Sequence, residues 1–127
     1  MENRFSHLDK KGNARIVNIS KKKKSSRYAK AQATIWLSSK IISMIKNDAF
    51  KKGNVISVAR IAGIMGAKQT SNLIPLCHNI SLDSSEINFR LLEEELEIVS
   101  IVQSEEKTGV EMEALTAVTI SALTIYD

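Results

Sequence analysis

The chain has 127 residues, of which 43% are hydrophobic and 25% charged, and its net charge is +4. This composition fits one ordinary soluble domain with a single core, and no apolar run approaches the roughly 20 residues that span a membrane. A single cysteine excludes an internal disulfide. Because the amino terminus also has no apolar leader, we expect a cytoplasmic location.

Charge is divided unevenly along the chain. Residues 1–52 hold 14 Lys plus Arg against 3 Asp plus Glu, a net of +11, whereas residues 53–127 hold 4 against 11, a net of −7. A basic half suits a polyanion such as nucleic acid or a nucleotide polyphosphate. A non-catalytic basic module that binds nucleic acid or a protein partner is therefore one alternative to an enzyme.

The first part of the chain predicts little regular structure. Residues 1–13 are polar and contain the turn-like Lys11-Gly12-Asn13, so we expect them to lie loosely on the surface. His7 is interpreted there as a surface residue rather than a ligand. Residues 15–20 alternate enough to predict a short strand.

Apolar residues at helical spacing then predict one amphipathic helix over residues 25–45. Arg27 and Lys30 would lie in its first turns. That end of a helix is unfavourable for cations, so the two side chains would have an anion to meet.

The next predicted helix covers residues 55–68. Its small residues let another backbone approach closely, and they are Ala59, Ala62, Gly63, Gly66 and Ala67. Packing on another helix or on another subunit is the expected use. Residues 58–72 can also be interpreted as a helix-turn-helix, but Pro75 breaks the second helix and argues against DNA binding.

Two strand-like runs follow at residues 85–91 and 96–103, separated by an acidic turn. Their alternating apolar residues predict an antiparallel hairpin. A last helix then runs from Gly109 to Asp127 without Gly or Pro in its interior. The order strand, helix, helix, hairpin, helix predicts an α+β sandwich.

The last helix carries three carboxylates among apolar and small side chains. At about 100° and about 1.5 Å per residue, Glu113 and Asp127 share a face but lie about 21 Å apart along the axis. Glu111 points nearly opposite to Glu113, which predicts different surroundings for the two. If both ends of the helix do chemistry, other segments or a second copy of the chain must complete each pocket. The alternative is that Glu111 and Glu113 only complement the helix dipole.

A Cys-His pair follows the only proline of the chain. His78 suits a general acid or base because imidazole titrates near neutral pH, although a structural histidine fits the pattern equally well. No second cysteine or spaced histidine pair accompanies Cys77, so the sequence argues against zinc. Lys52 stands beside the flexible Gly53 and could reach a phosphate, although a surface turn is the commoner explanation.

Three blocks of sequence carry a resemblance to a known family. They are residues 59–68 (ARIAGIMGAK), residues 73–78 (LIPLCH), and residues 107–116 (KTGVEMEALT) with 122–127 (ALTIYD). With them the chain closely resembles the cyclic pyranopterin monophosphate synthase family, also called molybdenum cofactor biosynthesis protein C. The resemblance runs from about residue 5 to the last residue.

The resemblance implies a ferredoxin-like α+β sandwich, with an antiparallel sheet packed on helices. It also implies a hexamer built as a trimer of dimers, with active sites at subunit interfaces. The implied enzyme is a lyase of molybdenum cofactor biosynthesis. It converts (8S)-3',8-cyclo-7,8-dihydroguanosine 5'-triphosphate to cyclic pyranopterin monophosphate and releases pyrophosphate by general acid and base catalysis. No cofactor is implied, although Mg²⁺ could accompany the triphosphate, and neither nucleic acid nor a membrane is an expected partner.

The resemblance also implies roles for individual residues. The catalytic residues would be Asp127, His78 and Lys52. The substrate would be bound by Leu76, Cys77, His78, Met112, Glu113, Lys68 and Arg27. Several cations suit a triphosphate, and proton shuttles suit the rearrangement of a purine into a pterin.

The chain departs from the family pattern at a few positions. Asn18 and Asn54 stand where the family usually has Asp, and Asn79 stands where it commonly has Pro. The family pattern continues past Tyr126-Asp127 with a catalytic lysine, a last strand and a Gly-rich tail. We therefore expect residues 1–127 to be a single synthase domain without that strand and tail. It would be either a fragment of a longer protein or an inactive truncated homologue.

Overall fold

A computed structural model gives the structure of the protein and describes residues 5–51 and 53–127. The elements in chain order are β1 (Ser25–Trp36), α1 (Ser39–Lys46), α2 (Val55–Lys68), α3 (Thr70–Leu73), β2 (Ser84–Leu91), β3 (Glu95–Glu106) and α4 (Glu111–Tyr126). Among these described helices, none is long and apolar enough to cross a membrane.

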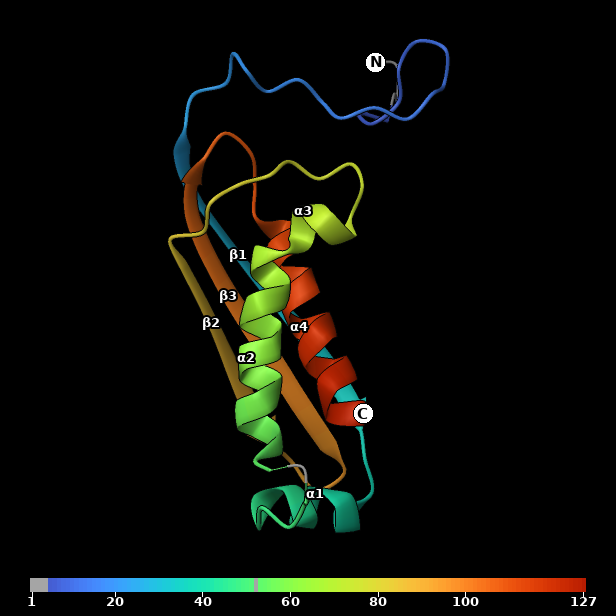
Figure 1. Cartoon of the computed structure of the whole chain (residues 1–127), viewed down its shortest axis with the longest axis vertical. Helices are drawn as coiled ribbons and strands as arrows, with labels where there is room; N and C mark the ends of the chain where they lie inside the picture. Colours follow the sequence, from blue (N-terminus) through green and yellow to red (C-terminus); the bar gives the residue numbers. More distant parts are fainter. Residues whose placement is uncertain (1–4, 52) are drawn as a thin grey trace.

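The described strands form an antiparallel sheet in the order β1-β3-β2. β1 pairs with β3 along its whole length, and β2 pairs with the other edge of β3, which confirms the predicted hairpin. The helices α2 and α4 lie side by side across one face of this sheet (Figure 1). The α+β prediction is confirmed. The order of strand, helix, hairpin and helix is that of the first five elements of the ferredoxin-like βαββαβ topology.

The helix predicted over residues 25–45 is wrong. Residues 25–36 form β1, and a helix begins only at Ser39, where the Ser38 hydroxyl accepts a hydrogen bond from the Ile41 N–H. Alanines at alternate positions of β1 fit helical spacing as well as strand spacing, and pairing with β3 decides between the two. Arg27 therefore does not lie in a helical turn, and its Nε donates to the Glu106 carbonyl.

The strand predicted over residues 15–20 is also wrong. The segment is irregular and pairs with no strand of the sheet. Its polar groups are satisfied locally instead, since the Asn18 side chain accepts hydrogen bonds from both the backbone N–H and the hydroxyl of Ser20.

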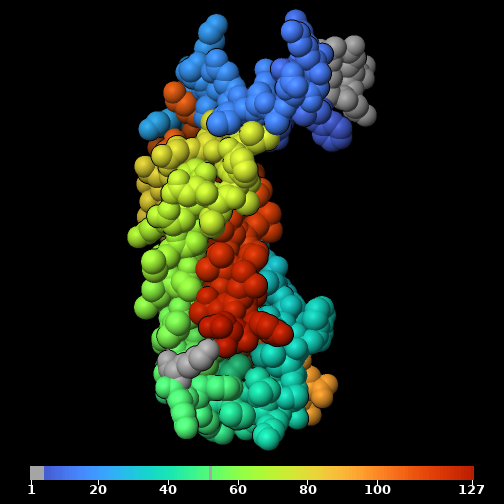
Figure 2. Space-filling model, turned by 45° about the vertical axis from the view of Figure 1, so that its right-hand side comes forward, coloured from blue at the N-terminus to red at the C-terminus, as the bar shows by residue number. Residues whose placement is uncertain are grey.

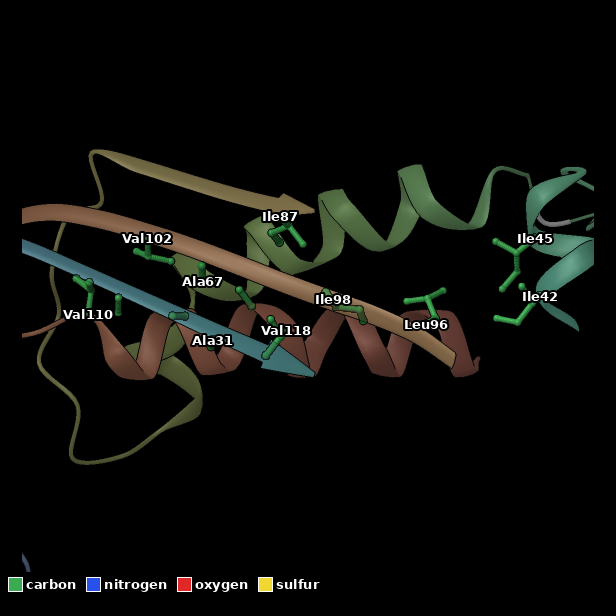
Figure 3. Close-up of a cluster of buried hydrophobic side chains, with 13 residues drawn as sticks. Ala31, Ile42, Ile45, Ala67, Ile87, Leu96, Ile98, Val102, Val110 and Val118 are labelled. Carbon is green, nitrogen blue, oxygen red and sulfur yellow. The ribbon is translucent and has the colours of Figure 1, made fainter. Parts of the chain in front are cut away.

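The core lies between β3 and the two long helices. Alternate residues of β3 point toward the helices and are buried, as predicted. They are Leu96, Ile98 and Val102, which Figure 3 shows, and Ser100. The buried hydroxyl of Ser100 donates a hydrogen bond of 2.7 Å to the Ala114 carbonyl, which fixes α4 on the sheet.

Small residues bring α2 against α4, as predicted. A methyl group added at Gly63 would lie 2.1 Å from the Ser121 hydroxyl and 2.9 Å from the Ala117 carbonyl oxygen. The Ser121 hydroxyl donates a hydrogen bond of 2.8 Å to the Ala59 carbonyl across the crossing. The position of each end of α4 is therefore set by a close contact near its middle.

Apolar side chains remain exposed on the outer sides of α2 and α4. They are Val58, Ile61 and Met65 on α2, and Leu115, Leu123 and Tyr126 on α4. The outer side of α4 is open to solvent in the space-filling view (Figure 2). The helix-turn-helix interpretation is not supported, because α3 has only four residues.

Candidate active site

A polar pocket of about 180 Å³ lies at the amino-terminal end of α4. Its lining residues are His7, Leu76, Cys77, His78, Thr108, Gly109, Glu111, Met112 and Glu113. They come from the amino-terminal loop, the bend after α3, and the turn that leads into α4. The structure thus brings together five of the predicted substrate-binding residues, from two segments far apart in the sequence.

Glu113 is the buried acid of this pocket. Its side chain is 5% exposed, and burial raises the pKa of its carboxyl above the ordinary value. The neighbouring charge of Glu111 raises this pKa further, while the carboxylate's hydrogen bond with its own backbone N–H lowers it. Burial, with the charge of Glu113, also raises the pKa of the Cys77 thiol. Burial in the pocket therefore favours the protonated form of both groups more than solvent would.

Glu111 lines the same pocket as Glu113, although the surroundings of the two differ in burial, as the helix geometry predicts. The backbone directions differ as expected, and Glu111 is exposed where Glu113 is buried. The flexible side chain of Glu111 nevertheless folds back over Gly109, where an added methyl group would lie 2.2 Å from its Oε2. Glycine at position 109 makes room for the second carboxylate.

His78 is held in one orientation by the backbone of the amino-terminal segment. Its Nε2 lies 2.5 Å from the Val17 carbonyl oxygen. Because a carbonyl can only accept a hydrogen bond, Nε2 carries the proton. In the neutral ring Nδ1 then has the lone pair that a general base needs.

A second, larger cavity of about 530 Å³ lies at the opposite end of α4. Its walls are mostly apolar side chains of α1, the connection to α2, and the last turn of α4, among them Ile41, Phe50 and Ile125. Asp127 and Lys51 are its charged lining residues. Gly53 also lines it, with a positive φ of 97° that favours glycine. The predicted catalytic Lys52 lies outside the described residues.

Comparison with known proteins decides the family. The family model described as MoaC family matches residues 16–127. The chain belongs to the MoaC family. It is 51% identical to the cyclic pyranopterin monophosphate synthase of Peptoclostridium acidaminophilum, over 97% of this chain and 78% of that protein. The synthase of Clostridium perfringens (strain SM101 / Type A) is 50% identical over 100% of this chain and 82% of its own length.

A longer relative contains the same region. The Drosophila melanogaster protein named molybdenum cofactor biosynthesis protein 1 is 46% identical over 97% of this chain and 22% of its own length. The family predicted from the three sequence blocks is thus confirmed, in both short and long relatives.

Two predicted substrate-binding cations of this MoaC-family chain lie outside both pockets. Lys68 is exposed in the last turn of α2, and Arg27 is half-buried at the start of β1. Neither belongs to the lining of the polar pocket or of the larger cavity. In residues 5–51 and 53–127, no group of three or more His, Cys, Asp and Glu side chains could hold a metal ion.

The sequence interpretation did not assign four lining residues of the polar pocket, namely His7, Thr108, Gly109 and Glu111. Helix geometry places Glu111 and Glu113 on opposite sides of the helix axis. Only the length and flexibility of the Glu111 side chain indicate that it can still reach the pocket. His7 was interpreted as a surface residue, and it is indeed exposed, yet it lines the pocket. No short-range pattern in residues 1–13 indicates that this loop returns to the site.

Proposed function

We propose that this chain is a cyclic pyranopterin monophosphate synthase of molybdenum cofactor biosynthesis. Its substrate is (8S)-3',8-cyclo-7,8-dihydroguanosine 5'-triphosphate, and the products are cyclic pyranopterin monophosphate and pyrophosphate. The observation that carries the proposal is the polar pocket in which His78, Cys77 and Glu113 meet, in a chain of the family whose relatives have this name.

The polar pocket supplies the proton transfers. His78 Nδ1 accepts a proton from the substrate, because Nε2 is committed to Val17. Glu113 supplies a proton, since its raised pKa keeps more of it protonated near neutral pH than an ordinary carboxyl. Rearrangement of a purine ring into a pterin needs such an acid and base rather than a redox centre.

The opposite end of α4 supplies the remaining groups. Lys52 holds the phosphates together with its neighbour Lys51, and Asp127 acts as an acid or base on the reacting part of the substrate. A helix rise of about 1.5 Å per residue separates Asp127 from Glu113 by about 21 Å, so one small substrate cannot contact both within one subunit.

A second copy of the chain therefore completes each site. In a two-fold pair, the polar pocket of one subunit meets the Asp127 end of the other. The exposed apolar side chains on the outer sides of α2 and α4 support such an association. Three of these dimers form a hexamer. The enzyme works in the cytoplasm, and Mg²⁺ reaches the site only as a counterion of the triphosphate.

The direct test is turnover of the cyclic triphosphate by the purified protein, followed as pyrophosphate release and as formation of the pterin product. We expect multiple turnovers per subunit. The contrary result is no turnover together with salt-sensitive binding to DNA or RNA, which would favour the basic binding module suggested by the charge of residues 1–52.

A further inference from the structure

The loop that carries His7 has a defined fold. The Asp9 carboxylate accepts hydrogen bonds of 2.8 Å from the Lys11 N–H and 2.9 Å from the Asn13 N–H. The Asp9 N–H donates to the Asn13 carbonyl, and the Arg15 N–H donates to the His7 carbonyl, both at 2.8 Å. These bonds close a small loop, so the backbone of His7 has a fixed position rather than the loose one that its polar sequence predicts.

The continuation of this loop is attached to the polar pocket at two points. The Val17 carbonyl accepts the hydrogen bond from His78, and the Ser20 carbonyl accepts one of 3.4 Å from Lys107 Nζ. Lys107 belongs to the turn between β3 and α4, which also forms part of the pocket wall. Figure 2 shows the amino-terminal segment, in blue, lying over the end of the molecule that carries α3. The attachment places His7 at the wall of the pocket.

The described lining of the polar pocket offers few nitrogen donors. Ionised Glu111 only accepts hydrogen bonds, and the His78 Nε2–H is committed to Val17. The other side-chain donors are the Thr108 hydroxyl, the Cys77 thiol and the Glu113 carboxyl when it is protonated. Among the described residues of the lining there is neither Lys nor Arg. A nucleotide, however, presents many oxygen acceptors. Within the part of the chain that the structure describes, neither nitrogen of the His7 ring is committed to a hydrogen bond.

We propose that His7 is a further substrate-contacting residue, whose ring donates a hydrogen bond to an oxygen atom of the bound cyclic nucleotide. The inference rests on the proposed function, since it takes the polar pocket as the substrate site. His7 supplies a ring N–H donor in a pocket whose described lining has neither Lys nor Arg. The amino-terminal loop is thereby part of the active site rather than a surface extension.

Kinetics of loop variants test this role. We expect His7→Ala to lower kcat/KM for the cyclic triphosphate by about tenfold to hundredfold, the range for a charge-assisted hydrogen bond. His7→Gln, which keeps an N–H donor, should recover part of the loss. Lys10→Ala changes an exposed residue of the same loop outside the pocket lining and should stay within about twofold of the unchanged protein. A His7→Ala protein with unchanged kcat/KM and an unchanged melting temperature would overturn the inference.

Proton NMR separates this inference from the proposed function, because the chain has only two histidines. The His7→Gln variant assigns their ring signals, and guanosine triphosphate serves as the probe nucleotide. We expect both rings to shift with one common saturation curve. A shift of His78 alone would overturn the role of His7 and leave the pocket as the substrate site. If neither ring shifts and the unchanged protein shows no turnover, the proposed function fails together with the inference.

Discussion

The two ends of α4 differ in size and in chemistry. The pocket at its start has about 180 Å³ and is lined by two carboxylates, two imidazoles and a thiol. The cavity at its end has about 530 Å³ and is lined mostly by apolar side chains, with Asp127 and Lys51 as its charged residues. The imidazoles and the buried carboxyl lie at one end, and Lys51 lies at the other.

Neither end alone has all the groups that the proposed reaction of a triphosphate needs. Among the described lining residues, the polar pocket has carboxyls and imidazoles but neither Lys nor Arg, and the larger cavity has no imidazole. The difference between the two ends indicates that α4 carries one half-site at each end. Their separation follows from the length of α4, and the close crossing of α2 and α4 at Gly63 and Ser121 holds this helix in place.

The largest effect on activity is expected from the polar end. His78→Ala removes the base that Val17 orients, and we expect kcat to fall by about 10² to 10⁴. Steady-state pyrophosphate release measures the loss. Asn79→Ala alters the exposed neighbour of His78 and serves as the matched control. A fall of less than tenfold would show that the proton transfers do not depend on this end of α4.

The largest effect on stability is expected at the helix crossing that both ends share. Gly63→Ala places a methyl group 2.1 Å from the Ser121 hydroxyl and 2.4 Å from Ile87 Cδ1. We expect a loss of about 3 kcal/mol in the free energy of unfolding, measured by urea denaturation. Adding Ser121→Ala should recover part of it by removing one clashing atom. A fully stable Gly63→Ala protein would mean that α2 and α4 do not need the close approach seen at Gly63.

A smaller effect, dependent on pH, is expected from Glu113. A raised carboxyl pKa means that the folded state holds its proton at pH values where the unfolded state has lost it, so stability falls as pH rises through that window. The Glu113→Gln variant has no carboxyl to ionise at this position, so its stability does not fall in this way as the pH rises. Its melting temperature should therefore exceed that of the unchanged protein by a few degrees at pH 8, and the difference should vanish near pH 4. A difference that does not grow with pH would contradict the burial argument.

The sequence predicted the α+β class, the hairpin, the helix over residues 55–68 and the last helix, because their periodic patterns agree with their packing. It failed over residues 25–36, where alanines suit both a helix and a strand and only the partner strand β3 decides. Within the site, the motifs around His78 and Glu113 were enough to predict five lining residues of the polar pocket.

The remaining parts of the site depend on contacts that the sequence pattern does not contain. His7 reaches the pocket through a loop closed by Asp9 and attached through Val17, and these bonds join residues with no shared periodicity. Glu111 joins Glu113 because its side chain bends over Gly109. Lys68 and Arg27 were predicted from the family pattern, and their contact with substrate stays a prediction.

Mixing two inactive variants tests most directly whether the half-sites of two subunits combine. His78→Ala disables the polar end and Asp127→Asn the other end. After the two proteins are mixed in equal amounts and allowed to exchange subunits, half of the dimers are mixed, and each mixed dimer has one intact site of two. We therefore predict that pyrophosphate release returns to about a quarter of the unchanged rate. Activity no higher than that of the separate variants, with subunit exchange shown by mass spectrometry, would contradict the account.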